Sequence, residues 1–417
     1  MFKTTIPIVL LVSLLSIMGG CTEEKKSNSN TPTMETLLYS DGQPIIIEIE
    51  NGKIEKLVRP EKKTIESKEI IYVAPGFIDH QINGYLSYSF VGDDLDEDKV
   101  IIITEALWKN GITSFLPTLT SESNELMLKN LNILNEVMKN KHIAQSIPGF
   151  HIEGPYLSPE DGFRGVHSLD YIREPNWEEF EAWHIASGSR VKEVTIAPEI
   201  NGAMEFIKKC IDNGIKVALG HTNATSLQIS QAVKLGASIS THLGNGCANM
   251  IHRHHNPIWP QLSEDGLTAS IIVDGFHLTK EEVRTFYKTK GAANIILVSD
   301  ITRLGGMPAG TYHDFGQEVV VTEEGAIMMP KENVLAGASF LVTKGIENII
   351  RFTDCSLEEA INMVTINPAN ALGILDRGEI AVGKRADLVY FKFNSGTLEI
   401  IRTIVGGEVV YDSATAH

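Results

Sequence analysis

The sequence is poor in cysteine and in positive charge, and each shortage excludes a class of protein. Its 417 residues include only 4 cysteines, too few to staple a chain of this length through disulfides. It carries 36 Lys and Arg against 53 Asp and Glu, a net charge of −17, so it lacks the basic field that nucleic-acid binding requires. Hydrophobic residues make up 43% of the chain, which excludes wholesale disorder, and the length suits one large domain with a smaller one.

An apolar run at the N-terminus predicts a targeting signal. Lys3 precedes the uncharged run 6–18, which is shorter than the about 20 apolar residues that span a bilayer. The small residues that follow the run and precede Cys21 indicate secretion, and this ending resembles a bacterial lipoprotein signal. We expect a signal peptide at 1–20, a lipidated Cys21 and a flexible tether over 21–34. The expected location is therefore an exported lipoprotein anchored to a membrane, either periplasmic or on the cell surface.

The pattern along the rest of the chain predicts an α/β fold. Short β-like runs occupy 35–73 and 374–417, and we expect these two ends to form one small β-sandwich domain. Between them, over 74–373, apolar strands alternate with helical segments, and such alternation favours a parallel sheet. A count of eight favours a closed (β/α)8 barrel of the TIM type. The expected strands are 75–80, 112–119, 147–153, 191–199, 217–221, 238–242, 269–274 and 295–300.

Polar residues gather at the C-terminal end of these strands, and those ends share one mouth in a barrel. They are Asp79, His80, Thr118, Glu153, Glu199, His221, His242, Asp274 and Asp300. Two imidazoles and a carboxylate, here His221, His242 and Glu153, form a common catalytic zinc set with an open position for water. Fe²⁺ or Mn²⁺ would also suit these ligands. Asp300 is then placed to take a proton from water and give it to a leaving nitrogen; the alternative is a turn cap.

The ordered motifs resemble those of the N-acetylglucosamine-6-phosphate deacetylases in the amidohydrolase superfamily. They include Gly149-Phe-His-Ile-Glu-Gly-Pro, Gly220-His-Thr-Asn-Ala-Thr, Thr241-His-Leu-Gly-Asn and Val273-Asp-Gly-Phe-His. The resemblance implies the same metal ligands, Asp300 as the acid/base, an amino-sugar substrate and a homodimer. Many superfamily members hold a second metal with His-x-His after the first strand, but Gln81 and Asn83 stand there, so we expect one metal. His80 lies one residue off this spacing, and we expect it on the other face of the strand.

The resemblance also implies residues that bind the substrate. A histidine in the loop after the third strand polarises the amide carbonyl, and His167 is its counterpart. The full expected set is Val166, His167, Asn245, Gly246, Arg253, Asp274, His277, Leu335, Ala336 and Gly337. The family's Asn-Ala is Asn245-Gly246 here, and the loop 250–257 replaces the segment that carries a phosphate-binding arginine. That loop could be an anion clamp, a subunit contact or a second metal site, and we favour the first two.

Location and substrate leave alternatives open. Phosphorylated amino sugars are normally cytosolic, whereas the N-terminus predicts export. The substrate is therefore N-acetylglucosamine-6-phosphate, an unphosphorylated relative, or another amide such as a cyclic amide, a dipeptide or an N-acyl amino acid. A cell-surface binding lipoprotein without catalysis is the weaker hypothesis, because all four key residues are present.

Overall fold

The computed structural model describes residues 36–60, 70–314, 316–331 and 334–415. The chain divides into two units, Met1–Met34 and Glu35–His417. The expected signal peptide, Cys21 and the tether lie outside the described residues. Among the residues that are described, no helix is both long enough and apolar enough to cross a membrane.

The second unit contains the predicted barrel, an eight-stranded sheet in which all neighbouring strands are parallel. The sheet closes just after its last strand, where Ile301 forms a parallel bridge with Ile82 of the first strand and the backbone N–H of Asn83 donates to the Ile301 carbonyl at 2.9 Å. Each strand overlaps one predicted from the sequence, so the barrel is confirmed. The strands are β5 (Phe77–Ile82), β8 (Ile112–Leu119), β9 (Phe150–Glu153), β10 (Val191–Ile196), β11 (Lys216–Leu219), β12 (Ile239–Ser240), β13 (Thr268–Ile271) and β14 (Ile295–Leu297).

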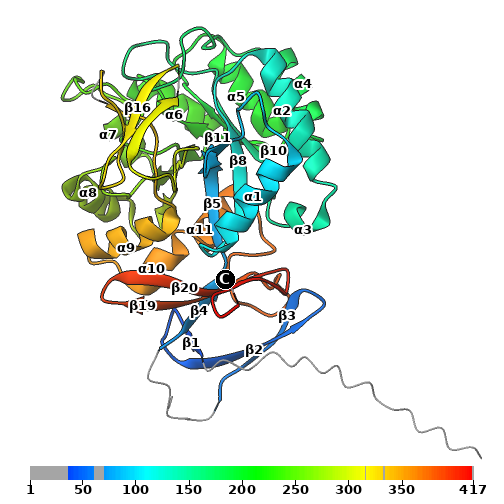
Figure 1. The fold of residues 1–417 in the computed structure, drawn as a ribbon. Helices are drawn as coiled ribbons and strands as arrows, with labels where there is room; N and C mark the ends of the chain where they lie inside the picture. The colour runs from blue at the N-terminus through cyan, green and yellow to red at the C-terminus, as the bar shows by residue number, and fades with distance from the viewer. Residues whose placement is uncertain (1–35, 61–69, 315, 332–333, 416–417) are drawn as a thin grey trace, which may run out of the picture. The chain divides into compact units, whose positions relative to one another are not determined.

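Helices surround the barrel strands, as Figure 1 shows. Polar capping residues fix where several of these helices begin. In one of them the Thr279 hydroxyl accepts a hydrogen bond from the backbone N–H of Glu282, and the Glu282 carboxylate accepts one from the backbone N–H of Thr279. Apolar residues one turn apart, such as Val283 and Phe286, then face the sheet. The helices are α1 (Glu97–Trp108), α2 (Asn124–Val137), α3 (Lys141–Ala144), α4 (Trp177–Ala186), α5 (Ala203–Asp212), α6 (Ser226–Leu235), α7 (Ile258–Ser263), α8 (Lys280–Lys290), a 3₁₀ turn (Ala292–Asn294), α9 (Val342–Phe352), α10 (Leu357–Asn362) and α11 (Ile366–Leu372).

The two ends of the second unit pair as predicted, and they do so in one seven-stranded mixed sheet. Its order is β21-β20-β19-β4-β1-β2-β3, which places the C-terminal strands beside the N-terminal ones. Asn51 and Gly52, both at positive φ, make the tight hairpin between β2 and β3. The strands are β1 (Thr36–Leu38), β2 (Pro44–Glu50), β3 (Lys53–Val58), β4 (Tyr72–Pro75), β19 (Leu388–Asn394), β20 (Thr397–Val405) and β21 (Glu408–Asp412).

Two smaller sheets are attached at the barrel mouth. A short ribbon pairs β6 (Gly84–Tyr85) with β7 (Tyr88–Ser89). After β14 comes an antiparallel sheet of β15 (Gly310–Asp314), β16 (Gln317–Val321), β17 (Ile327–Met329) and β18 (Val334–Leu335). This sheet has a hydrophobic cluster of its own, around Val319 and Ile327, and Val166 packs against that cluster. The loop after the third barrel strand is therefore tied to the sheet that follows the eighth.

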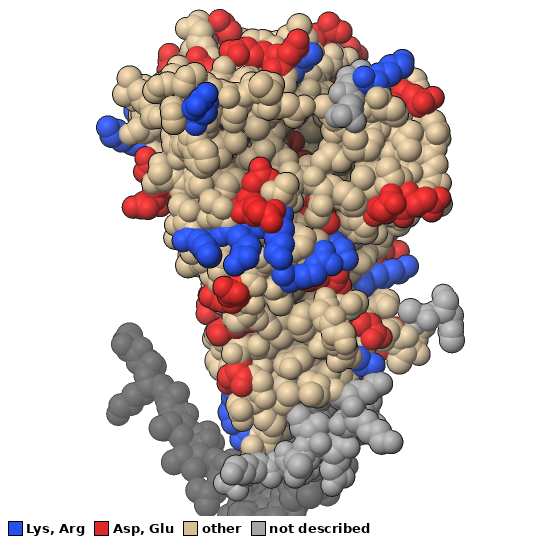
Figure 2. All heavy atoms as spheres, turned by 90° about the vertical axis from the view of Figure 1, so that its left-hand side faces the viewer, with Lys and Arg blue, Asp and Glu red and all other residues tan. Residues whose placement is uncertain are grey.

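The negative charge of the chain is unevenly distributed over its surface. On the face in Figure 2, Lys and Arg form a band across the middle, with Asp and Glu above and below it. Clustering of one sign in this way gives the face a local field that the net charge of −17 does not describe.

Candidate active site

The three predicted metal ligands converge at the barrel mouth. Glu153 ends β9, and His221 and His242 lie just beyond β11 and β12. Glu153 Oε1 lies 3.0 Å from His242 Nε2 and 3.4 Å from His221 Nε2, and all three residues are buried. Among the described residues they are the one group of three His, Cys, Asp or Glu side chains close enough to hold a metal ion.

The backbone is strained at these positions. His221, His242 and Asp300 have φ of +49°, +30° and +52°, a left-handed conformation that costs a non-glycine residue on the order of 1–3 kcal/mol. Each lies two or three residues beyond the end of a barrel strand, in the turn that leaves the strand at the mouth. The strained residues are therefore the ones whose side chains converge at the mouth, and such strain is common at functional sites.

The donor set fits a divalent metal. His221 Nδ1 donates to the Phe163 carbonyl at 3.0 Å, so Nε2, on the side of Glu153, is the ring nitrogen that remains for a metal. Burial raises the pKa of Glu153, but hydrogen bonds from His221 and His242 outweigh it and hold that pKa well below its usual range. The carboxylate is therefore ionised beside two imidazole nitrogens. Two nitrogens and one oxygen suit Zn²⁺, and they also suit Fe²⁺ and Mn²⁺.

Asp300 lies beside this group and is held by the first strand. Gln81 Nε2 donates to Glu153 Oε1 and to Asp300 Oδ1, both at 2.9 Å, and Asn83 Nδ2 donates to Asp300 Oδ1 at 2.7 Å. Burial and the negative charge of Glu153 raise the pKa of Asp300 to about 6. In the sequence, Gln81 and Asn83 were notable only because they stand where many superfamily members have two histidines. In the structure their side-chain amides hold the carboxylates of Glu153 and Asp300 in place, a role that sequence position alone did not reveal.

His167 is neutral and close to the ligands. Burial and the neighbouring His221 lower its pKa to about 3, and the two rings meet edge-on with centroids 4.5 Å apart. Its Nδ1 lies 2.8 Å from the Ser121 hydroxyl. If that hydroxyl donates, the ring proton stays on Nε2, which leaves a neutral donor for a developing oxyanion. Sequence reasoning missed Ser121, because a serine 46 residues away carries no local signal.

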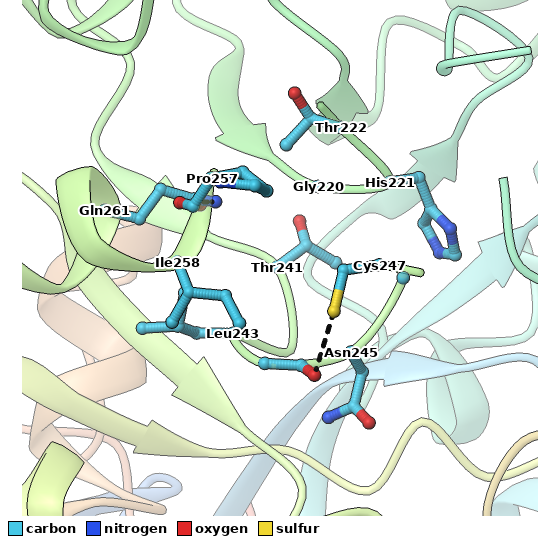
Figure 3. Close-up of a pocket in the computed structure, with 12 residues that line it drawn as sticks. Gly220, His221, Thr222, Thr241, Leu243, Asn245, Cys247, Pro257, Ile258 and Gln261 are labelled. Atoms are coloured by element: carbon cyan, nitrogen blue, oxygen red, sulfur yellow. Dashed lines mark hydrogen bonds between the residues drawn. The ribbon is translucent and has the colours of Figure 1, made fainter. Parts of the chain in front are cut away.

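Asn245 and Gly246 line a pocket that reaches His221 (Figure 3). Thr222, Thr241, Leu243, Cys247, Pro257, Ile258 and Gln261 also line it. Gly246 has φ of +57°, and a Cβ there would lie 2.8 Å from His221 Nδ1. The glycine that departs from the family's alanine is therefore in direct contact with a predicted ligand.

The remaining predicted substrate residues divide into two groups. His277 Nδ1 pairs with Asp274 Oδ2 at 2.7 Å, and His277 acts electrostatically on Asp300, so this pair belongs to the site. The stretch Leu335–Gly337 reaches it too, since the following Ala338 N–H donates to the Asp300 carbonyl at 3.2 Å. Arg253, by contrast, is exposed, and its guanidinium has no hydrogen-bond or ion-pair partner among the described residues.

The expected orientation of His80 is wrong. Its side chain does not leave the barrel but pairs inside it with Glu193 of β10, at 2.8 Å. The reason is an irregular register of β5 against β8 between Asp79 and Ile82, which breaks the simple alternation of faces. Glu193 itself escaped the sequence analysis because it lies in mid-strand, not at a strand end.

Known proteins share this architecture. Residues 72–410 match the Amidohydrolase family. The chain is 33% identical over 377 residues to the N-acetylglucosamine-6-phosphate deacetylase of Bacillus subtilis (strain 168), covering 88% of this chain and 93% of the relative. The crystal structure of N-acetylglucosamine-6-phosphate deacetylase from Thermotoga maritima matches with a TM-score of 0.79 at 31% identity, over 91% of this chain and 99% of that one. A mutant of the Mycobacterium smegmatis deacetylase, in complex with N-acetyl-D-glucosamine-6-phosphate, matches with a TM-score of 0.77 at 26% identity, over 90% and 99%.

These matches cover nearly all of the described residues, and they agree with the buried Glu-His-His group at the barrel mouth. The chain belongs to the amidohydrolase family, within its group of N-acetylglucosamine-6-phosphate deacetylases.

Proposed function

We propose that this protein is a metal-dependent deacetylase that hydrolyses the N-acetyl group of N-acetylglucosamine-6-phosphate. The observation that carries the proposal is the convergence of Glu153, His221 and His242 on one point, with Asp300 held beside them. Relatives and solved structures over nearly the whole described chain bear this name. The proposed residue roles follow from the geometry and from the chemistry of amide hydrolysis.

A divalent ion held by Glu153, His221 and His242 would supply Lewis-acid polarisation of the amide carbonyl and activation of water. Asp300 accepts the proton of the attacking water, and its raised pKa makes it able to return that proton to the amine nitrogen as the C–N bond breaks. Neutral His167 donates from Nε2 to the carbonyl oxygen as negative charge develops there. Acetate and glucosamine-6-phosphate are the products.

We assign the sugar to the rim of the same mouth. The residues assigned to the sugar are His277, which is fixed by Asp274, then Asn245 and Gly246 of the pocket, and the stretch 335–337. We assign the substrate's phosphate to Arg253 and the neighbouring histidines, because this exposed loop carries positive and titratable groups and no acidic residue. Val166 holds His167 against the sheet β15–β18. A homodimer that brings Arg253 to the partner's site would account for its exposure here.

We also propose export and membrane attachment through Cys21, on the strength of the N-terminal sequence alone. Export favours a second candidate substrate, an unphosphorylated N-acetyl amino sugar, because phosphorylated sugars are normally cytosolic. Labelling with a radioactive fatty acid in a bacterial host tests the anchor: the parent should be labelled and Cys21→Ala should not. Label that persists in the variant would overturn the proposed anchor.

Acetate release from the zinc-loaded protein without residues 1–20 tests the activity. N-acetylglucosamine-6-phosphate and N-acetylglucosamine are compared side by side, and Asp300→Asn should lower turnover by about 100- to 10,000-fold. Faster release from the phosphate ester supports the first candidate, and Arg253→Ala should then raise KM for that ester alone. Release from the free sugar only supports the second candidate. No release from either would overturn both.

A further inference from the structure

The barrel interior directly beneath the proposed ligands is ionisable, where such barrels are usually filled with branched aliphatic side chains. His80 Nδ1 lies 2.8 Å from Glu193 Oε2, and each side chain is 1% exposed. The ring of His151 is stacked with that of His80, with centroids 6.4 Å apart. His80 Nε2 and Glu193 Oε1 have no hydrogen-bond partner in the part of the chain that the structure describes.

Such a pair needs a reason other than stability. Removing two charges from water costs several kcal/mol per ion, and apolar residues of similar volume are often equal or better for the fold. Burial lowers the pKa of His80, but the Glu193 carboxylate outweighs it and the net shift is upward. Burial raises the pKa of Glu193, and His80 and His151 outweigh it in turn. Both shifts favour a charged pair.

The pair is connected to the strands that carry the ligands. Glu193 lies opposite His151 in the register of β9 and β10, and Thr195 lies opposite Glu153 two residues nearer the mouth. His151 Nε2 lies 2.8 Å from the Thr195 hydroxyl, which lies 2.8 Å from the Thr241 hydroxyl. Thr241 immediately precedes His242 in the chain. Hydrogen bonds therefore lead from His151 through Thr195 to Thr241, beside His242. The pair adjoins His151 through the stacked ring of His80 and the register position of Glu193.

We propose that the His80–Glu193 pair is a positioning layer, which fixes Glu153 and His242 for the metal through His151, Thr195 and Thr241. This inference rests on the metal centre of the proposed function. It concerns residues that contact neither substrate nor metal. It also gives a reason for the two charged side chains, His80 and Glu193, in the barrel interior below the metal ligands. Groups behind metal ligands typically change metal affinity by about 10- to 100-fold when they are removed.

The test replaces both partners, His80→Leu with Glu193→Leu, so that no charge is left buried alone. We expect the metal-free protein to melt no lower than the parent, while the zinc dissociation constant, measured by chelator competition, rises about 10- to 100-fold. The matched control is the Arg402–Asp412 pair of the small sheet, whose contact is 2.6 Å. Changing it to Met and Leu should leave zinc affinity unchanged.

If the double variant does not fold, Glu193→Gln decides, because it keeps the shape and removes the charge; zinc binding at least about 10-fold weaker supports the proposal. Parental zinc affinity in the folded double variant, or in Glu193→Gln where the double variant fails, overturns the positioning role and makes the pair a filler of the barrel. A parent that binds no stoichiometric zinc would overturn the metal centre itself. The two failures are therefore distinguishable without any measurement of turnover.

Discussion

Gly246 offers a direct test of how the site is built. Its φ of +57° costs a non-glycine residue about 1–2 kcal/mol, and an added Cβ would lie 2.8 Å from His221 Nδ1. The ring has little room to move, since a Cβ at Gly165 would also lie 2.9 Å from His221 Cε1. Relief therefore requires lengthening the 3.0 Å bond from His221 to the Phe163 carbonyl, a loss of about 1 kcal/mol.

Gly246→Ala should thus lower the free energy of unfolding by about 2–3 kcal/mol. It should also weaken zinc binding by about 10- to 100-fold, because the displaced imidazole is a proposed ligand. Urea unfolding and chelator competition measure the two effects. Gly214→Ala is the matched control, with φ of +75° and nothing within 4 Å of an added Cβ. It should show the backbone cost alone.

The refuting result is specific. If Gly246→Ala loses no more stability than Gly214→Ala and binds zinc like the parent, then His221 is not clamped between the two loops. In that case the His221 ring could move away from residue 246 without loss of stability or of zinc binding, and the close approach of Gly246 would not matter for the site.

Three further outcomes follow from the same geometry. The value of kcat/KM should fall as the pH drops through the pKa of Asp300, because a protonated carboxyl cannot accept a proton. That pKa is about 6 without metal and lower with a cation nearby. A value of kcat/KM that stays constant between about pH 4 and 6 would contradict the role of Asp300 as the base. Asn83→Leu removes a donor that lowers this pKa, so the acid limb of the pH–rate profile should move to higher pH, and an unmoved limb would show that the amide does not tune Asp300. Burial raises the thiol pKa of Cys210 and brings that of Cys355 to about 12, so a thiol reagent at pH 8 should label both far more slowly in the folded than in the unfolded protein; equal rates would contradict their burial.

Local pattern determined much of the fold and the outline of the site. Apolar runs bounded by helical segments indicated all eight barrel strands, because a buried parallel strand must be apolar on both faces. The polar residue at the end of a strand then located Glu153, His221, His242 and Asp300, since parallel strands deliver their C-terminal ends to one mouth. These predictions needed only the order of residues along the chain.

The tertiary structure alone decided what lies behind and beside those residues. Ser121 reaches His167 from 46 residues away, and Glu193 reaches His80 from 113 residues away, separations over which sequence gives no spacing signal. The irregular register of β5 turned His80 into the barrel, against the alternation of an ideal strand. Whether a polar side chain binds the metal, supports a metal ligand or stays exposed depends on which strands lie next to it. The neighbouring strands are fixed only when the barrel forms.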